Sequence, residues 1–169
     1  MVIYLDSNLI QYCADEKEFV LGRSENPRNR DETLGKELSA LKTLAEMDQF
    51  ADWQIAASPM LVAEIFRGKP TRDQIEAYPA LLEAWRESDW EEKFPIDGEE
   101  IHLAESYLKP LKLSSADSRH LAQAITLNAS WFLTNDQGIL KKCKKYDLPI
   151  RVSSVSECLD EIGTGLFLK

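Results

Sequence analysis

Short apolar segments alternate with helical patterns along this chain, and that alternation restricts the fold more than any other feature. Strands are predicted, in chain order, at 2–5, 53–58, 94–96, 131–134 and 150–152. No Asn-Gly or Asp-Gly hairpin turn joins two consecutive strands, so neighbouring strands are expected to be parallel. A parallel sheet needs helices on both of its faces. The sequence therefore predicts an α/β fold: a single domain over residues 1–169, built as a three-layer α/β/α sandwich around a mostly parallel sheet.

Helical periodicity accounts for most of the chain between these strands. The expected helices cover 7–13, 32–49, 69–90, 97–107, 115–129, 139–146 and 155–162. Ser58 followed by Pro59 marks the start of one more helix. The helix at 69–90 is expected to kink or break near Pro79. The segment 14–31 is polar and charged and contains Pro27, so it is predicted to be a loop insertion or a poorly ordered excursion.

The charge balance argues against one class of function. The chain has 29 acidic and 20 basic residues, a net charge of −9. A protein that binds an extended stretch of nucleic-acid duplex needs a basic face, which this balance disfavours. A small site in which metal ions neutralise the local field is still compatible with it.

Cysteine usage and hydropathy bear on the compartment. Cys13, Cys143 and Cys158 are odd in number, far apart and outside any CxxC pair. They are expected to be reduced thiols of a cytoplasmic protein rather than zinc ligands. No apolar run approaches the roughly 20 residues of a membrane span, and no signal peptide is recognisable, so no membrane partner is expected.

Two acidic residues follow predicted strands. Asp6 comes directly after the strand 2–5, and Asp136 follows the strand 131–134. In open parallel sheets the active site lies outside the carboxyl ends of the strands, where both acids are expected. Each also has a simpler interpretation, because Asp6 could cap the next helix and Asp136 could form an Asx turn.

Two further acidic residues lie on helix faces that should be buried. Glu64 shares a face with Met60 and Leu61, and Asp117 heads the apolar stripe of its helix. Asp117 could instead be an early-turn acid favoured by the helix dipole, and Glu64 could pair with Arg67. Taken together, four acids gathered at one edge would repel one another unless they shared a cation. An all-oxygen ligand set selects a hard ion such as Mg²⁺ or Mn²⁺.

The sequence resembles the PIN-domain nuclease family in four motifs that occur in the family's order. They are LDSN at 5–8, ASPMLVAEIFRG at 57–68, SADSRHLAQAI at 115–125 and FLTND at 132–136. The resemblance implies that Asp6, Glu64, Asp117 and Asp136 bind metal and catalyse cleavage, supported by Asn8 and Thr134.

Many small PIN proteins are the toxin half of VapBC-type toxin–antitoxin pairs, and they cut RNA until a partner blocks the site. The resemblance therefore implies a Mg²⁺- or Mn²⁺-dependent endoribonuclease for single-stranded or structured RNA, with a cognate antitoxin and a homodimer as expected partners. The segment 14–31 is longer than in the compact toxins. This departure bears on the toxin role more than on the nuclease chemistry.

Basic residues accompany the four acids and could hold phosphates of a single strand. The candidates are Arg67, Lys69, Lys112, Arg119 and Lys141. Taken singly, each is better explained as solvated surface charge. Hydrolysis of this kind needs no histidine base. His120 lies one turn after Asp117 and is expected on the helix surface rather than as a metal ligand.

Two alternative functions belong to other classes. A phosphatase of the haloacid dehalogenase type also begins with a strand and an Asp, but its motif requires a second Asp where this chain has Asn8. A catalytically silent interaction module would have no need of four intact acids.

Overall fold

The computed structural model describes residues 2–28, 31–51, 54–56, 63–64, 67–84 and 98–166. Four strands form one sheet in the order β2-β1-β3-β4. Their bounds are Val2–Leu5 (β1), Gln54–Ala56 (β2), Trp131–Leu133 (β3) and Arg151–Ser153 (β4). All three pairings are parallel, and Tyr4 is in register with Ala56 on one side and Phe132 on the other. The predicted parallel sheet is confirmed, whereas the predicted strand at 94–96 lies outside the described residues.

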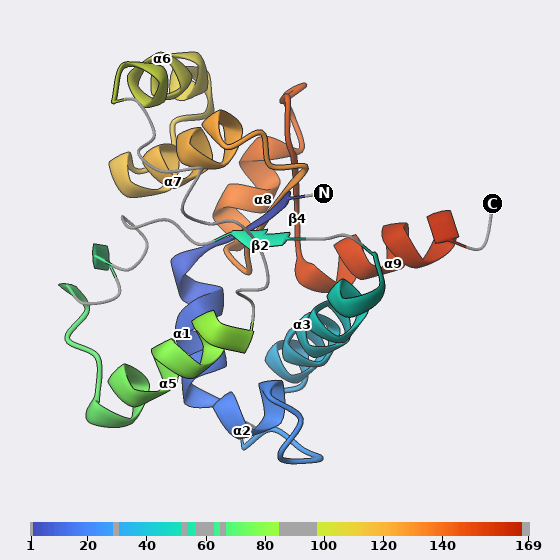
Figure 1. The fold of residues 1–169 in the computed structure, drawn as a ribbon. Coiled ribbons are helices and arrows are strands. Elements are labelled where there is room, and N and C mark those ends of the chain that lie inside the picture. The colour runs from blue at the N-terminus through green and yellow to red at the C-terminus, as the bar shows by residue number, and fades with distance from the viewer. Residues whose placement is uncertain are drawn as a thin grey trace.

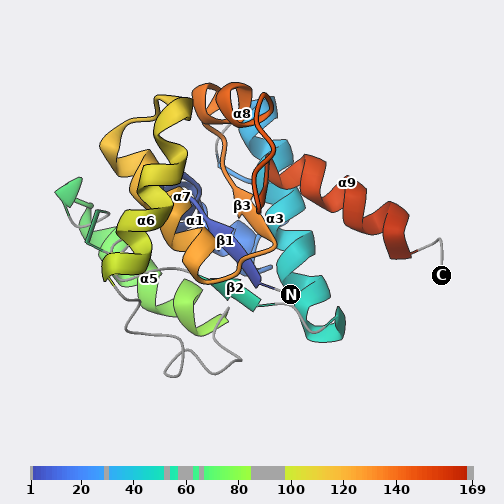
Figure 2. The same ribbon diagram turned by 90° about the horizontal axis from the view of Figure 1, so that it is seen from above.

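Helices cover both faces of the sheet (Figure 1). Below it in that view lie α1 (Ser7–Asp15), α2 (Lys17–Val20), α3 (Glu32–Ala51), α5 (Arg72–Ala84) and α9 (Val155–Leu166). Above it lie α6 (Gly98–Leu108), the 3₁₀ turn η2 (Lys109–Leu111), α7 (Ser115–Thr126) and α8 (Gln137–Cys143). Figure 2 shows the end of α9 extending away from the sheet. The structure is thus the predicted three-layer α/β/α sandwich.

The strands form this sandwich because their side chains alternate between two apolar clusters. Ile3, Leu5 and Leu133 belong to the cluster shared with α1, α3 and α9. Tyr4 and Phe132 belong to the cluster shared with α7 and α8, and their rings stack with centroids 5.6 Å apart. Because both faces of the central strands β1 and β3 are buried, these two strands are apolar runs, and the polar residues that follow them are available for a site.

The segment 14–31 is more ordered than its composition suggested. α1 continues to Asp15 rather than ending at Cys13, and α2 follows immediately. Phe19 and Val20 are buried in the core, and Glu16 accepts a hydrogen bond from the backbone N–H of Arg28 at 2.7 Å. The prediction of a loop was wrong for residues 14–20, because two buried apolar residues are enough to anchor one helical turn but too few to show a period, whereas residues 21–28 form turns and bends as a loop does.

Two other helix predictions have different outcomes. α5 continues through Pro79, so the helix does not break there as one of the two predicted alternatives required, and residues 85–90 of the predicted helix lie outside the described residues. Its first half is anchored beside α1 by the buried residues Ala77 and Tyr78, and this packing offsets the lost backbone hydrogen bond. The helix start predicted at Ser58 and Pro59 lies outside the described residues. None of the described helices is long and apolar enough to cross a membrane.

Candidate active site

Asp6 lies at the carboxyl end of β1 and is almost fully buried, with 4% of its surface exposed. Its Oδ1 accepts a hydrogen bond from the backbone N–H of Ser7 at 2.8 Å, so Asp6 is the N-cap of α1. Its Oδ2 accepts a 2.6 Å hydrogen bond from the hydroxyl of Thr134. The capping interpretation of Asp6 is therefore true, but it explains only one of the two carboxylate oxygens.

Thr134 joins the two acids that follow strands. Its hydroxyl donates to Asp6 and accepts a hydrogen bond of 3.0 Å from the backbone N–H of Asp136. The Oδ1 atom of Asp136 caps α8 by accepting from the backbone N–H groups of Gly138 at 2.6 Å and Ile139 at 3.1 Å. Asp136 is exposed, and within the described structure its Oδ2 makes no hydrogen bond. That oxygen is available for a ligand.

The pKa of the Asp6 carboxyl is set by influences that act in opposite directions. Burial raises the pKa of this carboxyl, and the hydrogen bond from Thr134 is the largest influence in the opposite direction. The His120 ring and the Ser7 backbone also lower the pKa, whereas the nearby carboxylate of Asp117 raises it. Asp6 and Asp117 are therefore close enough to repel each other, and a cation bound between them would relieve that repulsion.

Glu64 is held by a buried polar chain that begins in the sheet. Tyr4 donates its hydroxyl proton to Oε1 of Gln123 at 3.1 Å, and its oxygen lies 3.1 Å from Nδ1 of His120. The other ring nitrogen, Nε2, contacts Oε2 of Glu64. His120 is only 1% exposed, so the prediction that it lies on the helix surface was wrong. The signal was in the sequence: His120 is three residues after Asp117, on the same inward stripe.

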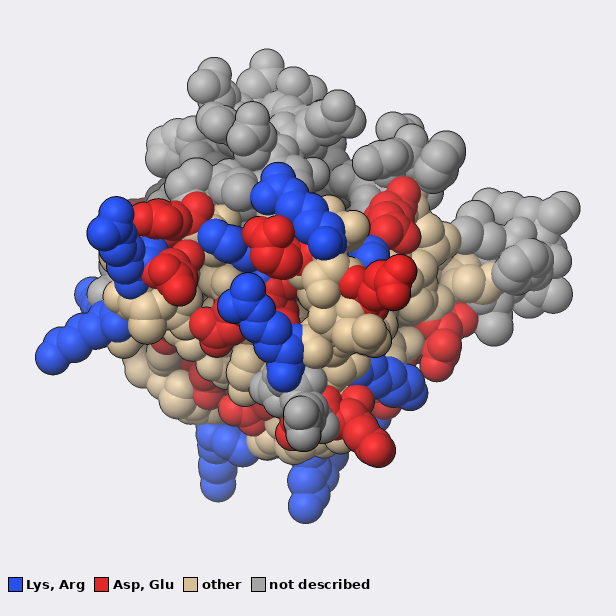
Figure 3. All heavy atoms as spheres, turned by 90° about the horizontal axis from the view of Figure 1, so that it is seen from below, with Lys and Arg blue, Asp and Glu red and all other residues tan. Residues whose placement is uncertain are grey.

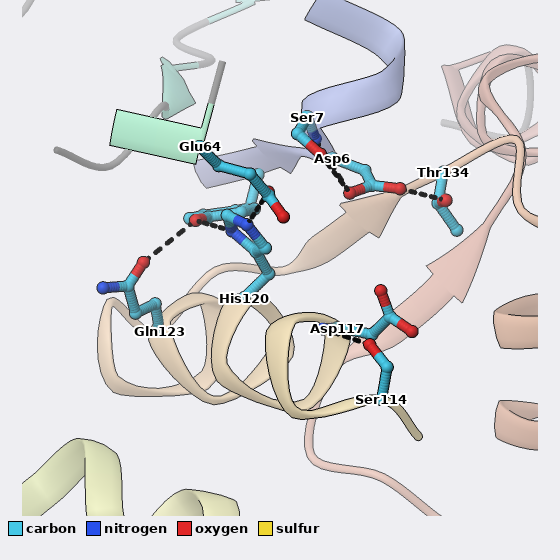
Figure 4. A network of polar contacts seen from close by, with 9 residues as sticks. Asp6, Ser7, Glu64, Ser114, Asp117, His120, Gln123 and Thr134 are labelled. Atoms are coloured by element: carbon cyan, nitrogen blue, oxygen red, sulfur yellow. Dashed lines mark hydrogen bonds and ion pairs between the residues drawn. The ribbon is translucent and has the colours of Figure 1, made fainter. Parts of the chain in front are cut away.

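Asp117 occupies the first turn of α7, where its backbone N–H donates to the hydroxyl of the N-cap residue Ser114 at 3.1 Å. Figure 4 shows the side chains of Glu64 and Asp117 pointing toward the edge of the sheet at which Asp6 lies. The structure thus brings Asp6, Glu64 and Asp117 to one edge, with Asp136 next along it through Thr134.

The remaining predicted site residues have no common arrangement. Asn8 is exposed, and its side chain makes no hydrogen bond in the described part of the chain. Arg67, Lys69, Lys112 and Lys141 are also exposed, and Arg119 is paired with Glu105 at 2.9 Å. Figure 3 shows acidic and basic side chains interspersed on one face, without a continuous basic surface.

The four acids have the oxygen ligands that a hard metal ion prefers, but their side chains are not gathered closely enough to bind one ion together. All four supply carboxylate oxygens, and Asp117 lies near enough to buried Asp6 to raise the pKa of Asp6. Among the described residues, however, no three His, Cys, Asp or Glu side chains are close enough to hold one ion. Asp136 is exposed, and Asp117 and Glu64 are partly exposed, so an ion can reach these carboxylates from solvent.

Comparison with known proteins supports the fold. No protein-family model matches the sequence, and no curated protein matches it. The fold is similar, with a TM-score of 0.58, to a chain in the crystal structure of VapBC2 from Rickettsia felis. That structure contains a DNA fragment from the VapBC2 promoter. The two chains are 17% identical, and the match covers 91% of this chain and 98% of that one. At this identity the likeness establishes a shared α/β fold.

Proposed function

We propose that this protein is a metal-dependent endoribonuclease that hydrolyses phosphodiester bonds of single-stranded RNA. The observation that carries the proposal is the buried carboxylate of Asp6, held by Thr134 and Ser7 at the end of the central strand β1, with the charge of Asp117 acting on it. A protein has little reason to bury one carboxylate next to a second, partly exposed carboxylate at a sheet edge unless a cation joins them.

Mg²⁺ or Mn²⁺ would be held by Asp6, Glu64, Asp117 and Asp136, and when bound it would supply an activated water and stabilise charge on the scissile phosphate. The protein's own contribution is orientation. Thr134 fixes the Asp6 carboxylate, and His120 fixes that of Glu64. No described residue other than His120 offers a histidine near this edge, and its two ring nitrogens are already engaged by Tyr4 and Glu64.

We further propose that the chain acts as the toxin of a toxin–antitoxin pair in the cytoplasm, as a homodimer that an antitoxin inhibits. The support is the likeness in fold to a chain of the VapBC2 complex, together with the order of the four acidic motifs. A small reading frame for a DNA-binding protein immediately upstream of this gene would support the pairing, and co-purification of the two proteins would test it.

The test of the enzymatic proposal is cleavage of an end-labelled single-stranded RNA. Cleavage should require Mg²⁺ or Mn²⁺ and stop in EDTA, and Asp117→Asn should abolish it because one oxygen ligand is lost. Undiminished cleavage in excess chelator would reject the metal mechanism. Hydrolysis of small phosphomonoesters without RNA cleavage would favour a phosphatase, and absence of both activities would favour an interaction module.

A further inference from the structure

A pocket of about 620 Å³ lies beside the candidate active site. It opens at the carboxyl ends of β3 and β4, because Asn135 follows β3, Ser154 follows β4, and both residues line it. Asn135 and Gln137 stand on either side of Asp136 in the chain, so the pocket adjoins the acidic edge on the side of β4. Ligand sites of α/β proteins are found in this position, and the volume suits a small organic ligand.

The acidic residues that line this pocket already have hydrogen-bond or ion-pair partners within the protein. Asp31 accepts hydrogen bonds from two backbone N–H groups at the start of α3. Glu37 accepts from two backbone N–H groups at the start of α9. Glu157 is paired with Lys144 at 3.0 Å, and this contact lowers the pKa of Glu157. The three carboxylates are therefore committed to the protein itself.

Four of the remaining lining side chains are suited to meet a ligand. Tyr12 is 37% exposed, Asn135 is partly exposed, and Gln137 and Lys141 are exposed. Within the described residues, no hydrogen bond or ion pair engages any of these four side chains. Together they offer an aromatic ring, two amides that can both donate and accept, and one ammonium group without an ion-pair partner among the described residues.

We propose that this pocket binds one nucleotide of the RNA substrate, next to the scissile phosphate. An aromatic ring provides a stacking surface for a base, and amide side chains match the donors and acceptors of base edges. Lys141 suits a phosphate of the same nucleotide. The assignment of this nucleotide as part of a substrate rests on the proposed ribonuclease function, whereas the binding of a nucleotide does not.

The binding test uses the metal-free protein. Adenosine, cytidine, guanosine and uridine 5′-monophosphates are titrated separately in EDTA, and binding is followed by NMR of the Asn135 and Gln137 side-chain amides. At least one nucleotide should bind in the millimolar range and shift both amides. Inorganic phosphate at the same concentration should leave the amides unshifted, because it has no base.

Matched variants separate the pocket from general surface effects. Tyr12→Leu should weaken nucleotide binding about tenfold through lost stacking, and Lys141→Gln should weaken it through lost phosphate contact. Tyr107→Leu and Lys145→Gln are the controls, because they change an exposed tyrosine and an exposed lysine that do not line the pocket. In RNA cleavage, the two pocket variants should raise KM about tenfold and leave kcat unchanged.

The outcomes distinguish this inference from the proposed function. If no nucleotide shifts the amides, or if the pocket variants bind nucleotides as tightly as the controls, the pocket is not a nucleotide site. If the wild-type protein cuts RNA but the pocket variants keep its KM, the pocket has no role in substrate binding and the inference fails while the ribonuclease stands. If nucleotides bind in the pocket but no RNA is cut, the nucleotide site stands and the ribonuclease proposal fails.

Discussion

At the scale of single residues, Asp6 is where folding and function oppose each other most directly. The carboxylate is 4% exposed, and burial raises its pKa despite the hydrogen bonds from Thr134 and Ser7. The unfolded chain therefore loses this proton at a lower pH than the folded protein does. As the pH rises from the unfolded pKa through the raised folded pKa, the wild-type protein loses stability, and the deficit is complete above the folded pKa.

Asp6→Asn is therefore expected to stabilise the metal-free protein at neutral pH and to abolish activity. Asn caps a helix about as well as Asp, so the interaction with α1 is retained while the buried charge is removed. The metal-free variant should melt at a higher temperature than wild type, with a difference that shrinks as the pH falls below the folded pKa. Cleavage should fall by more than about 100-fold. Mg²⁺ should raise the melting temperature of wild type more than that of the variant.

A fully active Asp6→Asn protein with the wild-type response to Mg²⁺ would contradict this account. It would mean that the carboxylate serves only as a helix cap.

His120 allows a second test at this scale, because the chain provides its own control. His120 is 1% exposed and contacts Tyr4 and Glu64, whereas His102 is largely exposed, with Nδ1 4.0 Å from Glu105. His120→Leu should lower the free energy of unfolding by about 1–3 kcal/mol, because two buried polar contacts are lost. His120→Gln should cost less, since its amide can still donate to Glu64.

Urea denaturation of these two variants, with His102→Leu as the control, provides the measurement. His102→Leu should change stability by no more than about 0.5 kcal/mol. Equal stability of the His120→Leu and His102→Leu variants would show that the buried chain from Tyr4 to Glu64 does not hold in solution.

At the scale of elements, Asp136 of the candidate site is also the N-cap residue of α8. A Cβ added at Gly138 would lie 2.9 Å from Oδ1 of Asp136, so any larger residue forces that carboxylate to move. A Cβ added at Gly98, in the first turn of α6, would meet nothing within 4 Å. Comparing Gly→Ala substitutions at these two positions therefore distinguishes the effect of helix propensity from the effect of moving the Asp136 carboxylate.

Gly138→Ala should leave stability almost unchanged but reduce cleavage. The gain in helix propensity, up to about 1 kcal/mol, is offset by the loss of a capping interaction of about the same size. Gly98→Ala should gain about 0.5–1 kcal/mol and leave cleavage unchanged. Thermal unfolding and initial cleavage rates of both variants provide the comparison. Wild-type cleavage by Gly138→Ala would show that Asp136 need not occupy its capped position.

Most elements near the site could be predicted from the sequence, because their signals are local. β1 and β3 are apolar runs that end in polar residues, and Asp6 and Asp136 follow them at the expected edge. α2 could not be predicted, since four residues are too few to show a period. The inward position of His120 follows from its spacing to Asp117, but its hydrogen bond with Tyr4 could not be predicted, because Tyr4 is 116 residues away in the chain and a contact at that separation leaves no local pattern.

At the scale of the whole molecule, the net charge of −9 limits how the protein can hold RNA. A protein that contacts 6–10 phosphates loses roughly 10³–10⁵ in affinity between about 50 and 200 mM salt. This chain has scattered basic residues and no continuous basic surface on the face shown in Figure 3. Salt would also screen the general repulsion between an acidic protein and RNA, which opposes the loss of specific phosphate contacts.

The KM for single-stranded RNA should therefore depend only weakly on salt. If two phosphates are contacted, each with a slope of about −0.7, KM should rise about sevenfold over the same fourfold change in salt. Lys141→Gln should reduce the slope by about 0.7, whereas Lys145→Gln, an exposed lysine outside the pocket, should leave it unchanged. Cleavage kinetics at several NaCl concentrations and a constant Mg²⁺ concentration measure these slopes. A rise of 10³-fold or more would require many phosphate contacts, and RNA would then be held by a basic surface rather than by the acidic edge and the pocket beside it.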